Sequence, residues 1–236
     1  MVQSSALSEW FAGLAAQFER NFLASNRWLQ LLNGLEVTLF VSLLAVILGT
    51  VLGVLFALMR LSKVKGLRFI AGVYIDVIRG TPMVVQLMIF YFVLLGPYTT
   101  LDKTMIGAVA FGCNSGAYVA EIVRAGILSI NVGQYEAGRS LGLTEWMTMR
   151  KIILPQAFKN ILPALGNELI VLVKETSVLG YIGVVDLARA GEQIRARTLD
   201  AFMPLLAVAA VYYVIVKLLS YLLSLLERRL RESDKR

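Results

Sequence analysis

Five stretches of the chain are long and apolar enough to cross a membrane as helices. They cover approximately residues 34–59, 67–95, 104–127, 160–185 and 201–226. A spanning helix needs about 20 consecutive, mostly apolar residues. The second stretch contains Gly80 and Pro82, which predict a break within it. We therefore expect an all-α integral membrane protein with five transmembrane helices.

The ends of the chain are more polar than these stretches. In residues 1–30, apolar residues such as Trp10 and Leu14 recur three or four positions apart among polar ones. This pattern predicts an amphipathic helix that lies at the outer surface of the membrane. The predicted transmembrane domain then covers residues 31–228, and residues 229–236 form a basic cytoplasmic tail.

The stretch between the third and fourth spans, residues 129–157, is too polar to cross a membrane. Gly142 is a typical residue for the end of a helix, and Thr144 is a typical cap at the start of one. We therefore predict two short helices divided at Gly142. Such a hairpin could bind a cytoplasmic partner, and composition alone leaves an ordinary interfacial loop as the alternative.

The composition supports a membrane protein and excludes several other classes. Hydrophobic residues make up 58% of the chain and charged residues 17%, whereas soluble domains carry roughly 45–50% apolar and about 25% charged residues. The mean hydropathy is +0.71. The single cysteine, Cys113, and the absence of histidine exclude a disulfide within the chain, a Cys/His zinc site and a histidine-based catalytic triad.

The basic residues predict the orientation of the chain. The net charge is +7, but the lysines and arginines lie in short blocks between apolar stretches, which argues against a nucleic-acid partner. Residues 60–68, 139–159 and 228–236 fall on one side of a five-span chain and hold 13 basic residues, against six on the other side. Cytoplasmic segments are enriched in lysine and arginine. We therefore expect the N-terminus outside and the C-terminus in the cytoplasm.

The polar loop carries a motif with defined spacing. It consists of Glu136-Ala137-Gly138, then Gly142, then Ile152-x-Leu154-Pro155. This pattern resembles the EAA loop of ABC-importer permeases, which reads Glu-Ala-Ala, a glycine four residues later, nine further residues, and Ile-x-Leu-Pro. Gly138 replaces the second alanine, which is a change between two small residues.

Further motifs are similar to those of the polar amino-acid permeases, the histidine/glutamine type. They are Arg79-Gly80-Thr81-Pro82 with Gln86, the segment Ser115 to Arg124, the segment Leu162 to Glu168, and Lys174 to Ser177. The resemblance covers the chain from about residue 30 to its end. It implies a type I importer permease in the bacterial cell membrane that carries polar amino acids.

The resemblance also implies the partners and the coupling residues. In this family the EAA loop docks in a groove of a cytoplasmic ATPase dimer, which here assigns ATPase coupling to Glu136, Ala137, Gly138, Leu141 and Gly142. The chain has no G-x-x-x-x-G-K-[ST] motif, so we expect ATP and magnesium on the partner ATPase and no cofactor, catalytic residue or metal site here. The other expected partners are an extracytoplasmic amino-acid-binding protein, the lipid bilayer and a second permease copy or a paralogue, because the chain shows no internal repeat.

Charged residues inside the predicted spans suggest a substrate path. A charge at the bilayer centre costs about 2.5–3.5 kcal/mol on insertion scales, so each such residue needs a partner or a function. Asp76 with Arg79 and Glu121 with Arg124 are three positions apart and could form ion pairs within a helix. A bound amino acid needs an acidic partner for its ammonium and a donor for its carboxylate. The residues that we predict to line such a path are Arg79, Thr81, Glu121, Glu168, Lys174, Glu175 and Ser177.

Two other functions stay open at this stage. A permease of the same class could carry another small solute. A secondary carrier driven by an ion gradient would also contain acidic residues in its spans, although the EAA loop and the small number of unrepeated spans oppose it.

Overall fold

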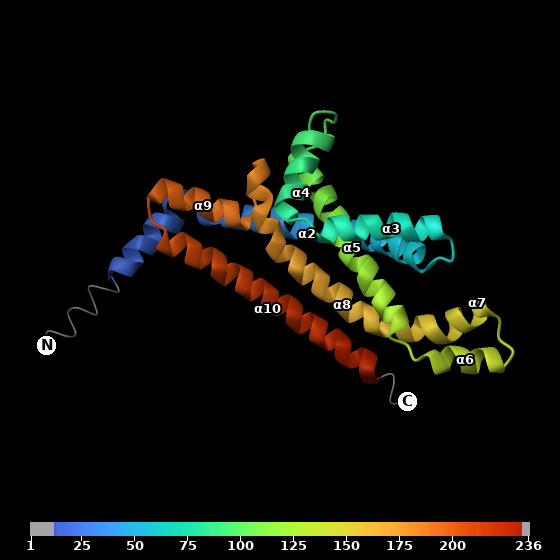
Figure 1. Cartoon of the computed structure of the whole chain (residues 1–236). Helices are drawn as coiled ribbons and strands as arrows, with labels where there is room; N and C mark the ends of the chain where they lie inside the picture. The colour runs from blue at the N-terminus through green and yellow to red at the C-terminus, as the bar shows by residue number, and fades with distance from the viewer. Residues whose placement is uncertain (1–11, 233–236) are drawn as a thin grey trace.

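The computed structural model describes residues 12–232, with side chains to Leu230. Every regular element in this part of the chain is a helix (Figure 1). The longer helices are α2 (Trp28–Leu61), α3 (Lys65–Arg79), α5 (Lys103–Leu128), α8 (Leu154–Glu175), α9 (Leu187–Thr198) and α10 (Phe202–Glu232). The shorter ones are η1 (Glu19–Leu23), η2 (Ala24–Asn26), α4 (Met83–Ile89), η3 (Phe90–Leu95), α6 (Val132–Ser140), α7 (Glu145–Thr148), η4 (Met149–Ile153) and η5 (Thr176–Ile182).

Three of the described helices, α2, α5 and α10, are each long and apolar enough to cross a membrane. The segment formed by α3, α4 and η3 gives a fourth crossing if its two parts count as one span. The helix of the predicted fourth span, α8, is not in this set; its 22 residues include lysine, glutamate, asparagine, glutamine and proline among the apolar ones. It also starts before the predicted residue 160 and ends at Glu175, where the tighter η5 follows.

The predicted break in the second span is present. Helix α3 ends at Arg79, and the backbone N–H of Gly80 still bonds to Asp76 O at 2.9 Å. Pro82 has an extended conformation directly before α4. Because proline has no N–H group and a fixed φ angle, it suits the position before a new helix. The two halves of the segment meet at 108°, so this is a sharp corner in the chain.

Helices α2 and α5 pack closely along their length, and glycines make this possible. A Cβ atom on Gly49 would lie 2.7 Å from the Cβ of Ser115, and one on Gly53 would lie 2.5 Å from the Cβ of Val119. Both distances are too short for real carbon contacts. Small residues at such spacing let helix backbones approach in membranes.

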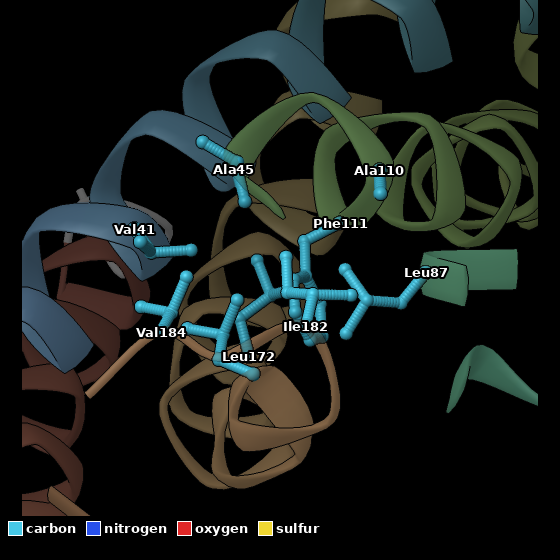
Figure 2. Packing of buried hydrophobic residues seen from close by; sticks show 10 residues of the cluster. Val41, Ala45, Leu87, Ala110, Phe111, Leu172, Ile182 and Val184 are labelled. Carbon is cyan, nitrogen blue, oxygen red and sulfur yellow. The ribbon is translucent and has the colours of Figure 1, made fainter. Parts of the chain in front are cut away.

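One apolar core joins α2, α4, α5, α8, η5 and the segment that follows η5 (Figure 2). Phe111 of α5 is fully buried there, beside Leu87 of α4 and Leu172 of α8. The outward faces of α2 and α10 instead expose large apolar side chains, such as Ile47 and Leu222. This distribution is typical of a helix bundle whose outer surface contacts lipid.

At both ends the structure describes only part of the predicted segments. Residues 1–11 of the predicted amphipathic segment lie outside the described residues; residues 12–18 are helical. Phe22 of η1 is buried against α9 and α10, and Asn21 donates a hydrogen bond to Asp200 at 2.6 Å, so this segment packs on protein as well as facing outward. At the other end, α10 continues to Glu232, and part of the predicted tail is therefore helical.

Candidate functional site

The polar loop forms the predicted helical hairpin, α6–α7. Asn131 caps α6 by accepting a hydrogen bond from the Gly133 N–H at 2.8 Å. Gly142 ends α6 with φ +82°, a conformation that glycine adopts without the strain of a side chain. The Thr144 hydroxyl then accepts from the Met147 N–H at 3.2 Å and caps α7. These contacts confirm the two helices, the division at Gly142 and the cap at Thr144.

The glycine that departs from the EAA pattern has a clear place in this hairpin. Gly138 is buried between α6 and the helix that follows. A Cβ atom there would lie 2.8 Å from Cγ2 of Thr148 and 2.9 Å from Cδ1 of Ile152. Glycine therefore lets α6 pack more closely on α7 and η4 than alanine would.

The surface of the hairpin presents apolar side chains to its surroundings. Leu141 is 81% exposed and Trp146 is 67% exposed. Glu136 and Ala137 are exposed as well. Where exposed apolar side chains gather into a patch they mark a surface that binds protein or membrane, and Leu141 and Trp146 are candidates for such a patch on this polar hairpin.

A second polar centre lies where α3 bends into α4. The side-chain nitrogen of Gln86 is 2.7 Å from Ile78 O, 3.0 Å from Thr81 O and 2.7 Å from the Thr81 hydroxyl. Its oxygen accepts a hydrogen bond from the side chain of Asn114 on α5 at 3.0 Å. Gln86 and Asn114 are buried, so these bonds satisfy carbonyl groups that the broken helix leaves without partners.

The two predicted ion pairs within helices have different outcomes. Arg124 contacts both oxygens of Glu121, with the closest approach at 2.8 Å, which confirms that pair. In the part of the chain that the structure describes, no ion pair joins Asp76 to Arg79. The Arg79 guanidinium lies instead over the ring of Tyr118 on α5, at 5.4 Å from its centre.

The acidic residues of α8 lie in two environments. Glu168 is 8% exposed and accepts a hydrogen bond from the Ser115 hydroxyl of α5 at 2.8 Å. Glu175 is half-buried and lines a groove of about 410 Å³ together with Lys174, Ser177 and Met83, the first residue of α4. Opposite charges and a hydroxyl thus meet beside the bend between α3 and α4.

No group of three or more histidine, cysteine, aspartate or glutamate side chains that could hold a metal ion is present among the residues described. The groove beside Glu175 contains one carboxylate, one ammonium and one hydroxyl among its lining residues. These groups suit an organic zwitterion, because each of its charges can find an opposite one.

Comparison with known proteins places this arrangement in a family. Residues 49–232 match the family described as "Binding-protein-dependent transport system inner membrane component". The chain belongs to this family. The matched residues contain the α6–α7 hairpin, the bend and the groove, so these features belong to a transport permease component with several membrane-spanning helices.

Curated relatives and a solved structure are similar over most of the permease. The putative glutamine transport system permease protein GlnP of Rickettsia bellii is 41% identical over 216 residues, covering 90% of this chain and 98% of that protein. The arginine transport system permease protein ArtQ of Bacillus subtilis is 42% identical over 207 residues, covering 86% and 94%. A crystal structure of an amino acid ABC transporter with histidines is 45% identical, with a TM-score of 0.83 and coverage of 88% and 98%.

The structure brings together only some of the residues predicted for the substrate path. Lys174, Glu175 and Ser177 line one groove. Glu168 is bonded to α5, Glu121 is paired with Arg124, Arg79 stacks on Tyr118, and Thr81 is bonded within the bend. The sequence reasoning did not single out Asn114, Ser115 or Gln86 as site residues. The sequence does contain a signal for these three residues: they are polar residues within apolar stretches, and such side chains need partners in a membrane.

Proposed function

We propose that this permease forms the membrane path of an ATP-driven importer for polar amino acids and that its α6–α7 hairpin binds a separate ATPase dimer. The observation that carries the proposal is the capped hairpin with its exposed Leu141 and Trp146. It lies at one end of the molecule, and η5 and α9 lie at the other end of α8 (Figure 1). A helix of 22 residues is about 33 Å long, so α8 links a coupling surface on one side of the membrane to the opposite side.

The groove beside the bend supports an amino-acid substrate. Glu175 can bind the ammonium group of an amino acid, and Lys174 and the Ser177 hydroxyl can bind its carboxylate. Relatives named for glutamine and arginine transport fit neutral and basic amino acids.

The proposal also includes the partners of the permease and its orientation in the membrane. A second copy of the permease or a related chain would complete the path. An extracytoplasmic binding protein would deliver the amino acid, and ATP with magnesium would bind to the ATPase. The basic segments, including the loop that contains Lys63 and the end of α10, would face the cytoplasm with the hairpin.

Charge reversal at Glu136 tests the coupling role. Glu136 is exposed on α6, so Glu136→Lys should leave the hairpin folded while it places a cation at the proposed ATPase contact. We expect loss of co-purification with the ATPase and loss of substrate-stimulated ATP hydrolysis. The matched control is Glu19→Lys, which reverses an exposed charge on η1 and should change neither. Substrate-stimulated ATP hydrolysis at the full rate in the Glu136→Lys permease would disprove the coupling role. ATP-driven uptake of a solute other than an amino acid would disprove the amino-acid substrate and leave the coupling role intact.

A further inference from the structure

A pocket of about 330 Å³ lies between η5 and α9, at the end of α8 that is remote from the coupling hairpin. Its lining consists of Ser177, Gly180, Tyr181, Ala188, Arg189 and Glu192. Small-molecule sites in proteins have volumes of roughly 300–1,000 Å³, so the pocket is at the lower end of that range. A solute as small as an amino acid fits this size.

The positive charge of Arg189 at this pocket is only partly neutralised by its acidic neighbour. Arg189 lies 3.2 Å from one oxygen of Glu192, and Arg195 lies 3.2 Å from the other. Hydrogen bonds from Arg195 and then from Arg189 hold the pKa of Glu192 below its usual range, so this carboxylate is charged at neutral pH. Two guanidinium groups therefore share one carboxylate, and the cluster carries a net charge of about +1.

The helix start holds Arg189 in a defined place. Asp186 caps α9 and accepts hydrogen bonds from the backbone N–H groups of Ala188 at 3.0 Å and of Arg189 at 3.1 Å. Tyr212 of α10 contacts the same carboxylate at 3.4 Å. Asp186 itself is fully buried, so the cap is part of the packed structure and fixes the backbone at Ala188 and Arg189. The Arg189 side chain starts from this fixed backbone, and an arginine guanidinium can bind a carboxylate through two parallel hydrogen bonds.

The pocket shares one lining residue with the groove beside the bend. Ser177 lines both spaces, with Arg189 and Glu192 in the pocket and Lys174 and Glu175 in the groove. An amino acid that moves past Ser177 would therefore exchange one pair of opposite charges for another. The carboxylate of the amino acid would meet Arg189 before it passes Ser177 and Lys174 afterwards.

We propose that the pocket between η5 and α9 is an outer subsite for the amino acid, where Arg189 binds the α-carboxylate before the solute passes Ser177 into the groove. The inference rests on the proposed amino-acid function and adds a site to it. The ligand class is a zwitterion with a free α-carboxylate. A solute without that carboxylate should bind this subsite poorly, because the partly compensated guanidinium would then lack its partner.

Protection of a single cysteine from labelling tests the subsite. Ala188→Cys in a Cys113→Ala background places a thiol in the pocket lining of the assembled importer in vesicles. The probe is the amino acid that these vesicles take up fastest among glutamine, arginine, cystine and histidine, and its α-carboxamide serves as the comparison. We expect the amino acid to slow labelling by an impermeant thiol reagent and the α-carboxamide to have little effect. Adding Arg189→Gln should raise the half-protecting concentration about tenfold, which corresponds to about 1.4 kcal/mol.

The control and the contrary results are specific to this pocket. Arg197→Gln removes an exposed arginine of the same helix that does not line the pocket, and should leave protection unchanged. Equal protection by the α-carboxamide, or unchanged protection after Arg189→Gln, would overturn the subsite. If the binding protein protects the cysteine from labelling without any amino acid present, the pocket is a docking surface for that protein, and the subsite proposal is overturned. If amino-acid uptake persists while protection is absent, the subsite alone is wrong; if no amino acid is taken up, the proposed function is wrong.

Discussion

Replacing Gln86 with leucine should destabilise the bend between α3 and α4. Leucine has a similar size but no polar atoms, so the substitution keeps most of the packing and removes the amide. The carbonyl groups of Ile78 and Thr81 then lose the donor that lies 2.7 Å and 3.0 Å from them. The side chain of Asn114 loses its acceptor at 3.0 Å.

The expected loss follows from the number of hydrogen bonds. The Gln86 amide nitrogen has two hydrogens for its three nearby acceptors, and its oxygen accepts one further bond, so about three bonds are lost. Hydrogen bonds between side chains in membrane helices contribute about 0.6 kcal/mol each on average. With the same value for the bonds to the backbone carbonyls, the loss is about 2 kcal/mol in the free energy of unfolding.

Reversible unfolding in mixed micelles, followed by circular dichroism, measures this difference. A suitable control is Gln134→Leu on the exposed surface of α6, which should change the free energy of unfolding by less than about 0.5 kcal/mol. A double-mutant cycle of Gln86→Leu with Asn114→Ala isolates the bond between these two side chains and should give a coupling energy of about 0.6 kcal/mol. A Gln86→Leu permease as stable as the parent would refute the reasoning that this amide satisfies the broken helix.

Three further predictions concern other parts of the permease. Glu168→Gln should lower amino-acid uptake severalfold while membrane abundance and basal ATP hydrolysis stay near normal; unchanged uptake over a range of concentrations would exclude a role in the path. Gly138→Val should separate α6 from α7, because even a Cβ atom is too close to its neighbours there, and pull-down with the ATPase should show the loss of binding. In a Cys113→Ala background, an impermeant thiol reagent added outside should label Thr100→Cys but not Ser140→Cys, and reversed labelling would reverse the orientation.

Local signals made the hairpin and the bend predictable from the sequence. Gly142 and Thr144 act on the backbone within a few residues of themselves, through a positive φ angle and a side-chain cap. Pro82 likewise acts on its own helix start. Such features depend little on the rest of the fold, so residue type and spacing are sufficient to find them.

Contacts between helices could not be predicted in the same way. Asp76 and Arg79 have the spacing of an ion pair, but the position of Tyr118 depends on how α5 packs against α3, and the guanidinium lies over that ring. Glu168 and Glu175 are seven residues apart on one helix, yet the first bonds to α5 and the second lines the groove. Which neighbour each polar residue meets is decided by tertiary packing.

Uptake of radiolabelled amino acids by proteoliposomes tests the central proposal most directly. The vesicles contain this permease with its partner ATPase and receive the loaded binding protein outside, with ATP or a non-hydrolysable analogue inside. We predict that amino acids accumulate only with ATP and with the ATPase present, and that Glu136→Lys abolishes the accumulation. Accumulation that is driven by an ion gradient in vesicles without the ATPase would contradict the proposal and would identify a secondary carrier.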